Sequence, residues 1–375
     1  MFNFRTIALV GGTVICAVGF LLFIPLITEI IYQSGSWQSY AVPILLYLIV
    51  GGALVITNRN LDLKISTKDA FLITVLSWML FTILCSVPFI YTEINLSIVD
   101  ALFESMSGVT TTGATVMNNL DQTPKGILIW RAILQWLGGI GIIVIALVIL
   151  PFLRIGGMQL FHLEGDDPYD KFLPKISSVV SKIFLVYVAL TIALFLLYHL
   201  NGMSLFDSLA HSFTTISTGG FSTHNNSFAY FNDTTILNIA IIFMIIGSFP
   251  FLILAQSSFS NITSVIRDHQ IQLFLIILIF AVSLIYFFAK NYVDGDIFFK
   301  LSTISFNTIS IISGTGYVSD NFENWGNYAS VLFLILMFIG GCAGSTTGGL
   351  KVFRFQILFK YVSLHFKKML KPHIV

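Results

Sequence analysis

A polar stretch, Ser107-Gly-Val-Thr-Thr-Thr-Gly113-Ala-Thr-Val116, lies between two long apolar runs and decides the fold. Related stretches follow at Phe213-Thr-Thr-Ile-Ser-Thr-Gly-Gly220-Phe-Ser-Thr223 and at Ile309-Ser-Ile-Ile-Ser-Gly-Thr-Gly316-Tyr-Val-Ser319. Aligned on their glycines, the copies are 107 and 96 residues apart. We interpret the three stretches as loops that line one ion pathway.

The composition places these loops in a membrane. Apolar residues make up 56% of the 375-residue chain and charged residues 10%. Soluble domains are about a quarter charged, so the chain reads as an integral membrane protein surrounded by lipid. A formal net charge of +1 gives no electrostatic footprint for a nucleic-acid partner.

Apolar runs long enough to cross a bilayer recur along the whole chain, since about 20 residues suffice for a spanning helix. They predict an all-α polytopic membrane protein with eight spans, near residues 6–31, 39–57, 70–91, 127–153, 178–200, 234–256, 271–290 and 328–350.

Basic residues predict the orientation. With eight spans, 15 of the 19 Lys and Arg residues fall on one side, and Lys125, Arg131, Lys290 and Lys300 fall on the other. The positive-inside rule then places both termini in the cytoplasm. The outer side carries the carboxylates Glu93, Asp100, Glu104, Asp121, Asp207, Asp233, Asp294, Asp296, Asp320 and Glu323. They either concentrate cations at a pore mouth or are ordinary solvated loop charges, and the sequence favours neither.

The polar loops divide the chain into repeats of span, loop and span. We expect an N-terminal helix pair over 1–69, a first repeat over 70–177 with loop 107–116, a second over 178–270 with loop 213–223, and a third over 271–375 with loop 309–319. Asp100 and Asp207 each precede the loop glycine by 13 residues, whereas the third repeat has Thr303 there.

The segments before the loops, about 99–109, 206–216 and 299–311, are too short to span and predict re-entrant half-helices. Their C-terminal ends would favour a cation, and the carbonyl oxygens that follow could replace its hydration shell. We expect cation binding only at the filter residues Thr111, Thr112, Gly113, Thr218, Gly219, Gly220, Thr315 and Gly316. Simple polar turns would explain one such loop, but three at matching positions favour the filter.

A run of small residues, Gly340-Gly-Cys-Ala-Gly-Ser-Thr-Thr-Gly-Gly349, interrupts the last apolar segment and predicts a broken helix. We favour a flexible gate beneath the filter over close helix packing. The expected gate residues are Gly340, Gly341, Gly344, Ser345, Thr346, Thr347, Gly348 and Gly349.

Other polar features give weaker indications of function. Arg131 either snorkels to the outer surface or pairs with an outer carboxylate. The glycines of Gly138-Gly-Ile-Gly141, and Gly247 with Pro250, are expected at packing and bending points. The acidic run Glu164-Gly-Asp-Asp-Pro-Tyr-Asp170 would suit a membrane enzyme, but no nucleophile or metal cluster accompanies it. We expect neither an enzyme nor a cofactor, and His199, His211 and His224 receive no catalytic role.

The chain resembles the Trk/Ktr/HKT superfamily of potassium uptake proteins, and most closely the bacterial TrkH-type subunit. The resemblance rests on Phe103–Val116, Gln135–Ile142, Leu153–Leu160, Ser217–His224 and Gly340–Lys351. It implies potassium uptake across the bacterial inner membrane through carbonyl-lined filter loops of a pseudo-fourfold pore. It also implies a gate at 340–349, a homodimer, and control by a cytosolic nucleotide-binding regulatory subunit.

The family has four repeats around one pore, whereas three are present here. A fragment or truncated product, a separate chain carrying the fourth repeat, and a non-conducting regulatory or interaction subunit remain open from the sequence.

Overall fold

The computed structural model of this chain describes residues 4–59, 67–153, 169–256 and 265–370, which form helices and connecting turns with one isolated bridge between Ile339 and Leu350. Two compact units contain residues 1–138 with 221–225, and residues 139–220 with 226–375. We call them the first and second units. The all-α prediction is confirmed for the described residues.

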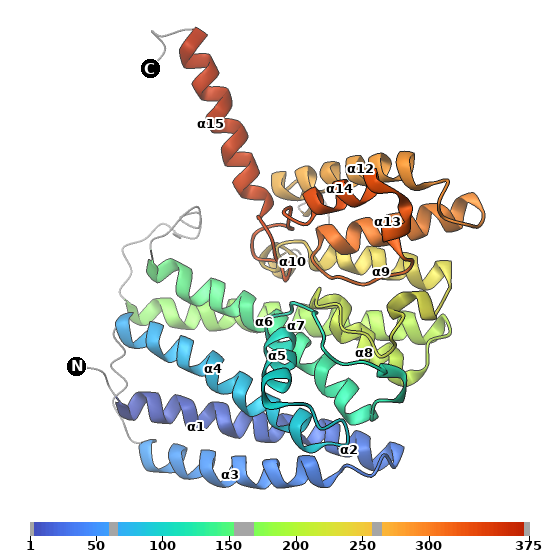
Figure 1. Ribbon diagram of the computed structural model, residues 1–375. Helices are drawn as coiled ribbons and strands as arrows, with labels where there is room; N and C mark the ends of the chain where they lie inside the picture. Colours follow the sequence, from blue (N-terminus) through green and yellow to red (C-terminus); the bar gives the residue numbers. More distant parts are fainter. Residues whose placement is uncertain (1–3, 60–66, 154–168, 257–264, 371–375) are drawn as a thin grey trace. The chain divides into compact units, whose positions relative to one another are not determined.

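The first unit holds α1 (Phe4–Leu21), α2 (Phe23–Tyr32), α3 (Gln38–Asn58), α4 (Thr67–Tyr91), α5 (Ile98–Val109) and the start of α6 (Lys125–Leu153). Helices α1 and α3 lie side by side (Figure 1). They approach closely at glycines, because a Cβ added to Gly12 would lie 2.8 Å from the Leu54 Cβ, and one added to Gly51 would lie 2.7 Å from the Cys16 sulfur. Small residues permit such contacts where lipid supplies no hydrophobic drive.

The second unit contains the rest of α6 and α7 (Tyr169–Leu200), α8 (Leu205–Ile216), α9 (Thr234–Gly247), α10 (Phe251–Gln256), α12 (His269–Ala289), α13 (Ile297–Ile312), α14 (Asn327–Leu336) and α15 (Val352–Leu370). Helix α13 packs on both α9 and α12 (Figure 1). A core around Ile304, Trp325 and Phe333 joins α13 to the segment that leads into α14.

Six helices of the described residues are long and apolar enough to span a membrane. They are Phe4–Tyr32, Gln38–Asn58, Phe71–Tyr91, Lys125–Val144, Ser177–Leu200 and His269–Ala289. The predicted spans 234–256 and 328–350 are interrupted helices, and the interruptions lie where the sequence predicted a bending point at Gly247 with Pro250 and a helix break over 340–349. Helix α9 stops at Gly247, three residues before Pro250, and α14 stops at Leu336, before the glycine-rich run.

The two interruptions satisfy each other's backbone groups inside the second unit. Cys342 and Thr346 donate their N–H groups to the carbonyls of Ser248 and Gly247, at 3.0 and 3.3 Å, and Phe251 donates to Gly344 at 3.0 Å. Non-helical backbone at membrane depth is tolerated where such partners exist. The predicted helix break over 340–349 is therefore present.

The three expected half-helices are also present as α5, α8 and α13, which we call the pore helices. They end at Val109, Ile216 and Ile312, within one residue of the predicted ends, so the first three or four residues of the stretches 107–116, 213–223 and 309–319 are helical. The repeat boundaries at 69, 177 and 270 remain a prediction. The acidic run 164–170 lies outside the described residues except for the start of α7, whose side chains there are not described.

Candidate functional site

All three pore helices begin with a capped N-terminus. The hydroxyls of Ser97 and Ser204 accept the N–H groups of Asp100 and Asp207, at 3.2 and 3.0 Å, and each hydroxyl donates back to that aspartate's carboxylate at 2.7 Å. In α13 the carboxylate of Asp296 accepts the N–H of Phe299 at 3.1 Å. Such caps satisfy orphan helix donors, and they explain the paired aspartates of the first two repeats.

The pore helices also end alike. We call Gly113, Gly220 and Gly316 the filter glycines, after the role predicted for them. Two residues before each, the N–H groups of Thr111, Thr218 and Gly314 donate three residues back, each at 3.0 Å. One residue later, those of Thr112, Gly219 and Thr315 donate five residues back, each at 2.9 Å. This pair of bonds is a Schellman cap. The three loops therefore leave their helices in one geometry.

The backbone is left-handed at two positions of each loop, two residues apart. The φ angles are 55° and 78° at Thr111 and Gly113, 48° and 82° at Thr218 and Gly220, and 69° and 82° at Gly314 and Gly316. Glycine adopts such angles freely. Threonine does not, and a left-handed non-glycine residue costs about 1–2 kcal/mol. The sequence keeps this strain in two of the three loops.

The second and third loops touch within the second unit. A Cβ added to Gly220 would collide with the carbonyl oxygen of Thr315, whereas one added to Gly316 would meet nothing within 4 Å. Gly220 is therefore required by close approach as well as by its φ angle.

The C-terminal ends of α5 and α8 pack closely against glycines of the helices that follow them in the chain, α6 and α9. A Cβ on Gly138 of α6 would collide with the carbonyl of Val109, the last residue of α5. A Cβ on Gly247 of α9 would lie 3.1 Å from the carbonyl oxygen of Ile216, the last residue of α8. These contacts agree with the packing role predicted for both glycines.

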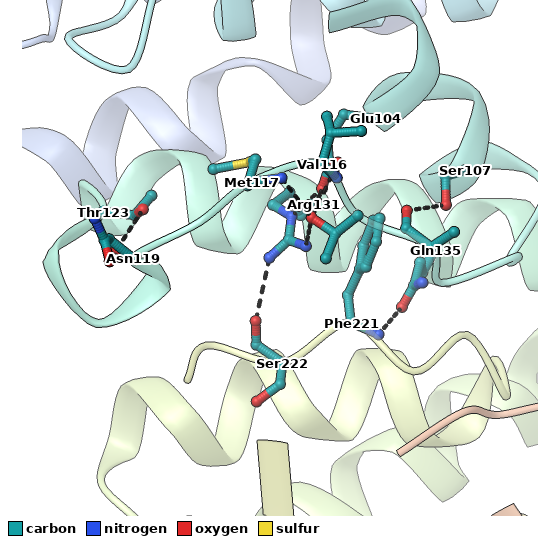
Figure 2. A network of polar contacts seen from close by, with 12 residues as sticks. Glu104, Ser107, Val116, Met117, Asn119, Thr123, Arg131, Gln135, Phe221 and Ser222 are labelled. Atoms are coloured by element: carbon teal, nitrogen blue, oxygen red, sulfur yellow. Dashed lines mark hydrogen bonds and ion pairs between the residues drawn. The ribbon is translucent and has the colours of Figure 1, made fainter. Parts of the chain in front are cut away.

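A buried ion pair lies behind the first loop (Figure 2). The Arg131 Nε donates to the Glu104 carboxylate at 2.7 Å, and both side chains are almost fully buried. Glu104 also accepts the Thr115 hydroxyl at 2.9 Å and the Val116 N–H at 3.1 Å. Arg131 therefore pairs with a carboxylate and does not snorkel. Glu104 and Asp207 are buried, so neither alternative left open for the outer carboxylates, an exposed acidic mouth or solvated loop charges, describes these two.

The same network holds the chain that follows the second filter glycine. Arg131 donates from Nη1 to the Ser222 carbonyl at 3.2 Å, and its guanidinium carbon lies 4.0 Å from the Phe221 ring centroid. The Gln135 amide oxygen accepts the Phe221 N–H at 3.0 Å (Figure 2). These residues all belong to the first unit.

The third repeat repeats the supporting contact with a neutral side chain. Glu104 and Asn307 each precede the filter glycine of their loop by nine residues. The side-chain oxygen of each accepts the N–H of the residue three positions after that glycine, from Val116 at 3.1 Å and from Ser319 at 3.2 Å. The second repeat has His211 at this position, buried against Phe228 and Phe231. Sequence reasoning missed this position, although alignment of the repeats on their glycines exposes it.

The glycine-rich segment contacts the second of the three loops through Thr346. Its hydroxyl donates to the carbonyls of Gly247 and Ile216, at 3.0 and 3.3 Å, and accepts the Thr218 hydroxyl at 3.1 Å. The ammonium of Lys351 donates to the Thr347 carbonyl and hydroxyl and to the Ser345 hydroxyl. Ser345, Thr346 and Thr347 of the predicted gate are thus held by polar contacts.

Outside the pore helices, His224 and Asp121 form a contact of 2.6 Å in the first unit, a partner that the sequence did not reveal. The hydrogen bond from His224 is the main cause that lowers the pKa of the Asp121 carboxyl below its ordinary value of 3.8. Within the described residues, no group of three or more His, Cys, Asp or Glu side chains could hold a metal ion.

The fold and the loops define a multi-pass membrane protein with re-entrant pore helices. The sequence model of one family, described as "TrkH: Cation transport protein", matches residues 38–375. The chain belongs to this TrkH family.

Individual relatives agree with this assignment. The chain is 37% identical over 380 residues to the "Trk system potassium uptake protein TrkH" of Escherichia coli (strain K12), covering 100% of this chain and 78% of that protein. It is 34% identical over 340 residues to TrkG of the same organism, covering 90% and 70%. The crystal structure of the potassium transporter TrkH from Vibrio parahaemolyticus superposes with a TM-score of 0.89 at 32% identity, covering 100% of this chain and 78% of that one.

Proposed function

We propose that this chain takes up potassium across the bacterial inner membrane, as a transporter and not an enzyme. The carbonyl groups of Thr111, Thr112 and Gly113, of Thr218, Gly219 and Gly220, and of Thr315 and Gly316 form its filter. Potassium is the cargo. The relatives TrkH and TrkG of Escherichia coli, which are potassium uptake proteins, support this assignment.

One observation carries the proposal. Each of the three loops leaves its pore helix through the same cap and is left-handed at the same two positions. Alternation of left- and right-handed residues turns successive carbonyls toward one side of the chain, as an oxygen-lined ion path requires. The negative ends of the pore helices add a favourable field for a cation at the start of each loop.

The proposed gate is the segment from Gly340 to Gly349. Thr346 links it to the last carbonyl of α8 and to Thr218 of the second loop. A movement of this segment would therefore act on the filter loop directly. The same proposal includes homodimer formation and control by a cytosolic nucleotide-binding subunit. Its support is the family resemblance and the naming of the relatives as components of a Trk system.

Rubidium uptake into cells that lack their own potassium uptake systems tests the filter. Gly220→Ala should reduce uptake about tenfold or more, which corresponds to about 1.4 kcal/mol, because the new Cβ meets the Thr315 carbonyl. Gly202→Ala is the matched control, since Gly202 also has a positive φ, of 103°, but nothing within 4 Å of an added Cβ.

Potassium-dependent protection of the purified chain against heat provides a second readout that does not need transport. Gly220→Ala should lose this protection and Gly202→Ala should keep it. Equal uptake and equal protection in the two variants would show that the second loop is not a filter.

A further inference from the structure

The residue that follows the filter glycine differs in size among the loops. It is Ala114 in the first, Phe221 in the second and Tyr317 in the third. The two aromatic side chains are buried, with exposed fractions of 4% and 1%. Each lies against the pore helix of the preceding repeat.

Tyr317 contacts the second pore helix, α8. Its hydroxyl is hydrogen-bonded to the hydroxyls of Thr214 and Thr215, at 2.5 and 3.1 Å, and Thr215 is bonded in turn to the Tyr198 hydroxyl at 3.0 Å. The ring packs on Phe228 with centroids 4.5 Å apart. The carbonyl of Tyr317 accepts the Ser310 hydroxyl of its own pore helix at 2.8 Å. Both ends of this residue are therefore fixed.

Phe221 contacts the first pore helix, α5, in the same register. Gly108 lies five residues before Gly113, as Thr215 lies five before Gly220. A Cβ added to Gly108 would lie 3.4 Å from the Phe221 ring, so this glycine provides the surface on which the ring rests. The Arg131 guanidinium lies over the ring at 4.0 Å, a favourable cation–π contact.

We propose that Tyr317 and Phe221 are positioning residues that brace one filter loop against the pore helix of the preceding repeat. Each brace fixes the loop from the side at the level of its filter glycine. It thereby limits how far the adjacent carbonyls can move inward around a cation smaller than potassium. Selection against sodium then depends on these side chains, although neither touches the ion. The inference rests on the proposed potassium filter.

The chemistry of the two braces is different. Tyr317 is held by directional hydroxyl bonds, which resist both approach and separation. Phe221 is held by ring contacts, which tolerate sliding, together with the N–H bond to Gln135. Loss of the Tyr317 hydroxyl is therefore the cleaner perturbation, because the ring and its packing remain.

Competitive uptake of rubidium against sodium tests the brace. Tyr317→Phe should lower the preference for rubidium by about tenfold, as expected for the loss of two neutral hydrogen bonds, while rubidium uptake without sodium stays within about twofold. Tyr328→Phe is the matched control, because the Tyr328 side chain is 73% exposed.

The partner side of the brace gives an independent series. The Thr214→Val/Thr215→Val double variant removes both hydroxyl partners and should reproduce the loss of preference, and Thr214→Ser/Thr215→Ser should restore it. This pattern distinguishes positioning from a general loss of folding, since Thr and Val have similar volumes.

Each outcome decides the inference. If the wild-type chain prefers rubidium and Tyr317→Phe prefers it equally, the brace is wrong and the filter stands. If the Val pair and the Ser pair behave alike, the hydroxyl bonds do not set selectivity and the brace is again wrong. If the wild-type chain shows neither uptake nor potassium-dependent protection, the proposed function fails and the brace fails with it.

Discussion

Burying Glu104 and Arg131 removes two charges from water. This desolvation cost is offset because both charged groups are hydrogen-bonded. The Glu104 carboxylate accepts hydrogen bonds from Arg131, Thr115 and Val116, and the Arg131 guanidinium also donates to the Ser222 carbonyl. Removal of one partner from a buried pair usually costs about 3–5 kcal/mol, whereas removal of both costs far less.

We therefore expect Arg131→Met to lower the free energy of unfolding by about 3–5 kcal/mol, because it leaves the Glu104 carboxylate buried without its counter-charge. The Glu104→Gln/Arg131→Met double variant should recover part of this loss, since the neutral amide oxygen of the substituted side chain can still accept the Val116 N–H. Thermal or denaturant unfolding in lipid–detergent mixtures measures both. A double variant no more stable than Arg131→Met would contradict the argument.

The contact between Asp121 and His224 makes a separate prediction about pH. Because the pKa of Asp121 is lower in the folded chain than its ordinary 3.8, the folded state favours the carboxylate. The stabilisation from the contact is complete at pH values above the ordinary pKa and disappears as the pH falls through the lowered pKa.

Wild-type protein should therefore lose stability below about pH 4 more steeply than Asp121→Asn. Asp294→Asn, which changes an exposed loop carboxylate, serves as the control and should follow the wild-type curve. Unfolding temperatures measured from pH 3 to pH 7 give the comparison. Parallel curves for wild type and Asp121→Asn would show that the contact contributes nothing in solution.

At the scale of the element, the sequence predicted the pore helices because their lengths and polar ends are local properties. The bounds expected for all three lie within two residues of α5, α8 and α13. The sequence did not predict that the breaks near Ser248 and Gly340 bond to each other, because they lie about 90 residues apart. A helix break is visible in glycine and proline content, but its partner depends on tertiary structure.

The caps of the pore helices predict a measurable cost. Ser204→Ala removes the acceptor of the Asp207 N–H and should destabilise the chain by about 0.5–2 kcal/mol. Ser283→Ala is the control, since Ser283 lies exposed inside α12 and bonds only back to Ile279, at 2.8 Å. Alanine is favoured at such interior positions. Equal unfolding temperatures for the two variants would count against the cap.

At the scale of the whole molecule, composition alone identified a membrane protein, since apolar helices follow from chain-wide hydropathy. Hydropathy continues through Pro250 and the glycine-rich run while the helix does not, so the two interruptions were predicted from proline and glycine content and not from hydropathy. The candidate filter residues came from repetition. The pairing of Arg131 with a carboxylate was one of two alternatives, and the supporting roles of Glu104 and Asn307 were not predicted, because residue type does not show whether a polar side chain is buried or exposed.

Orientation is the prediction that belongs to the whole chain. A cysteine introduced at Lys300 should react with a membrane-impermeant maleimide in intact cells, and one introduced at Lys367 should react only after the membrane is opened. The expectation follows from the 15 basic residues on the predicted cytoplasmic side. The reverse labelling pattern would place both termini outside.

The pore helices differ in length at one end only. Helix α13 has 16 residues and α5 and α8 have 12, yet all three end four residues before the filter glycine. The four additional residues of α13 make about one helical turn, and they lie at its N-terminal end, away from the filter glycine. If the repeats arose by duplication, insertions have been free to accumulate upstream of Glu104, His211 and Asn307, whereas the interval from there to three residues past the glycine has kept its count. Chimeras that exchange pore segments between relatives should therefore be joined upstream of this interval and never within it.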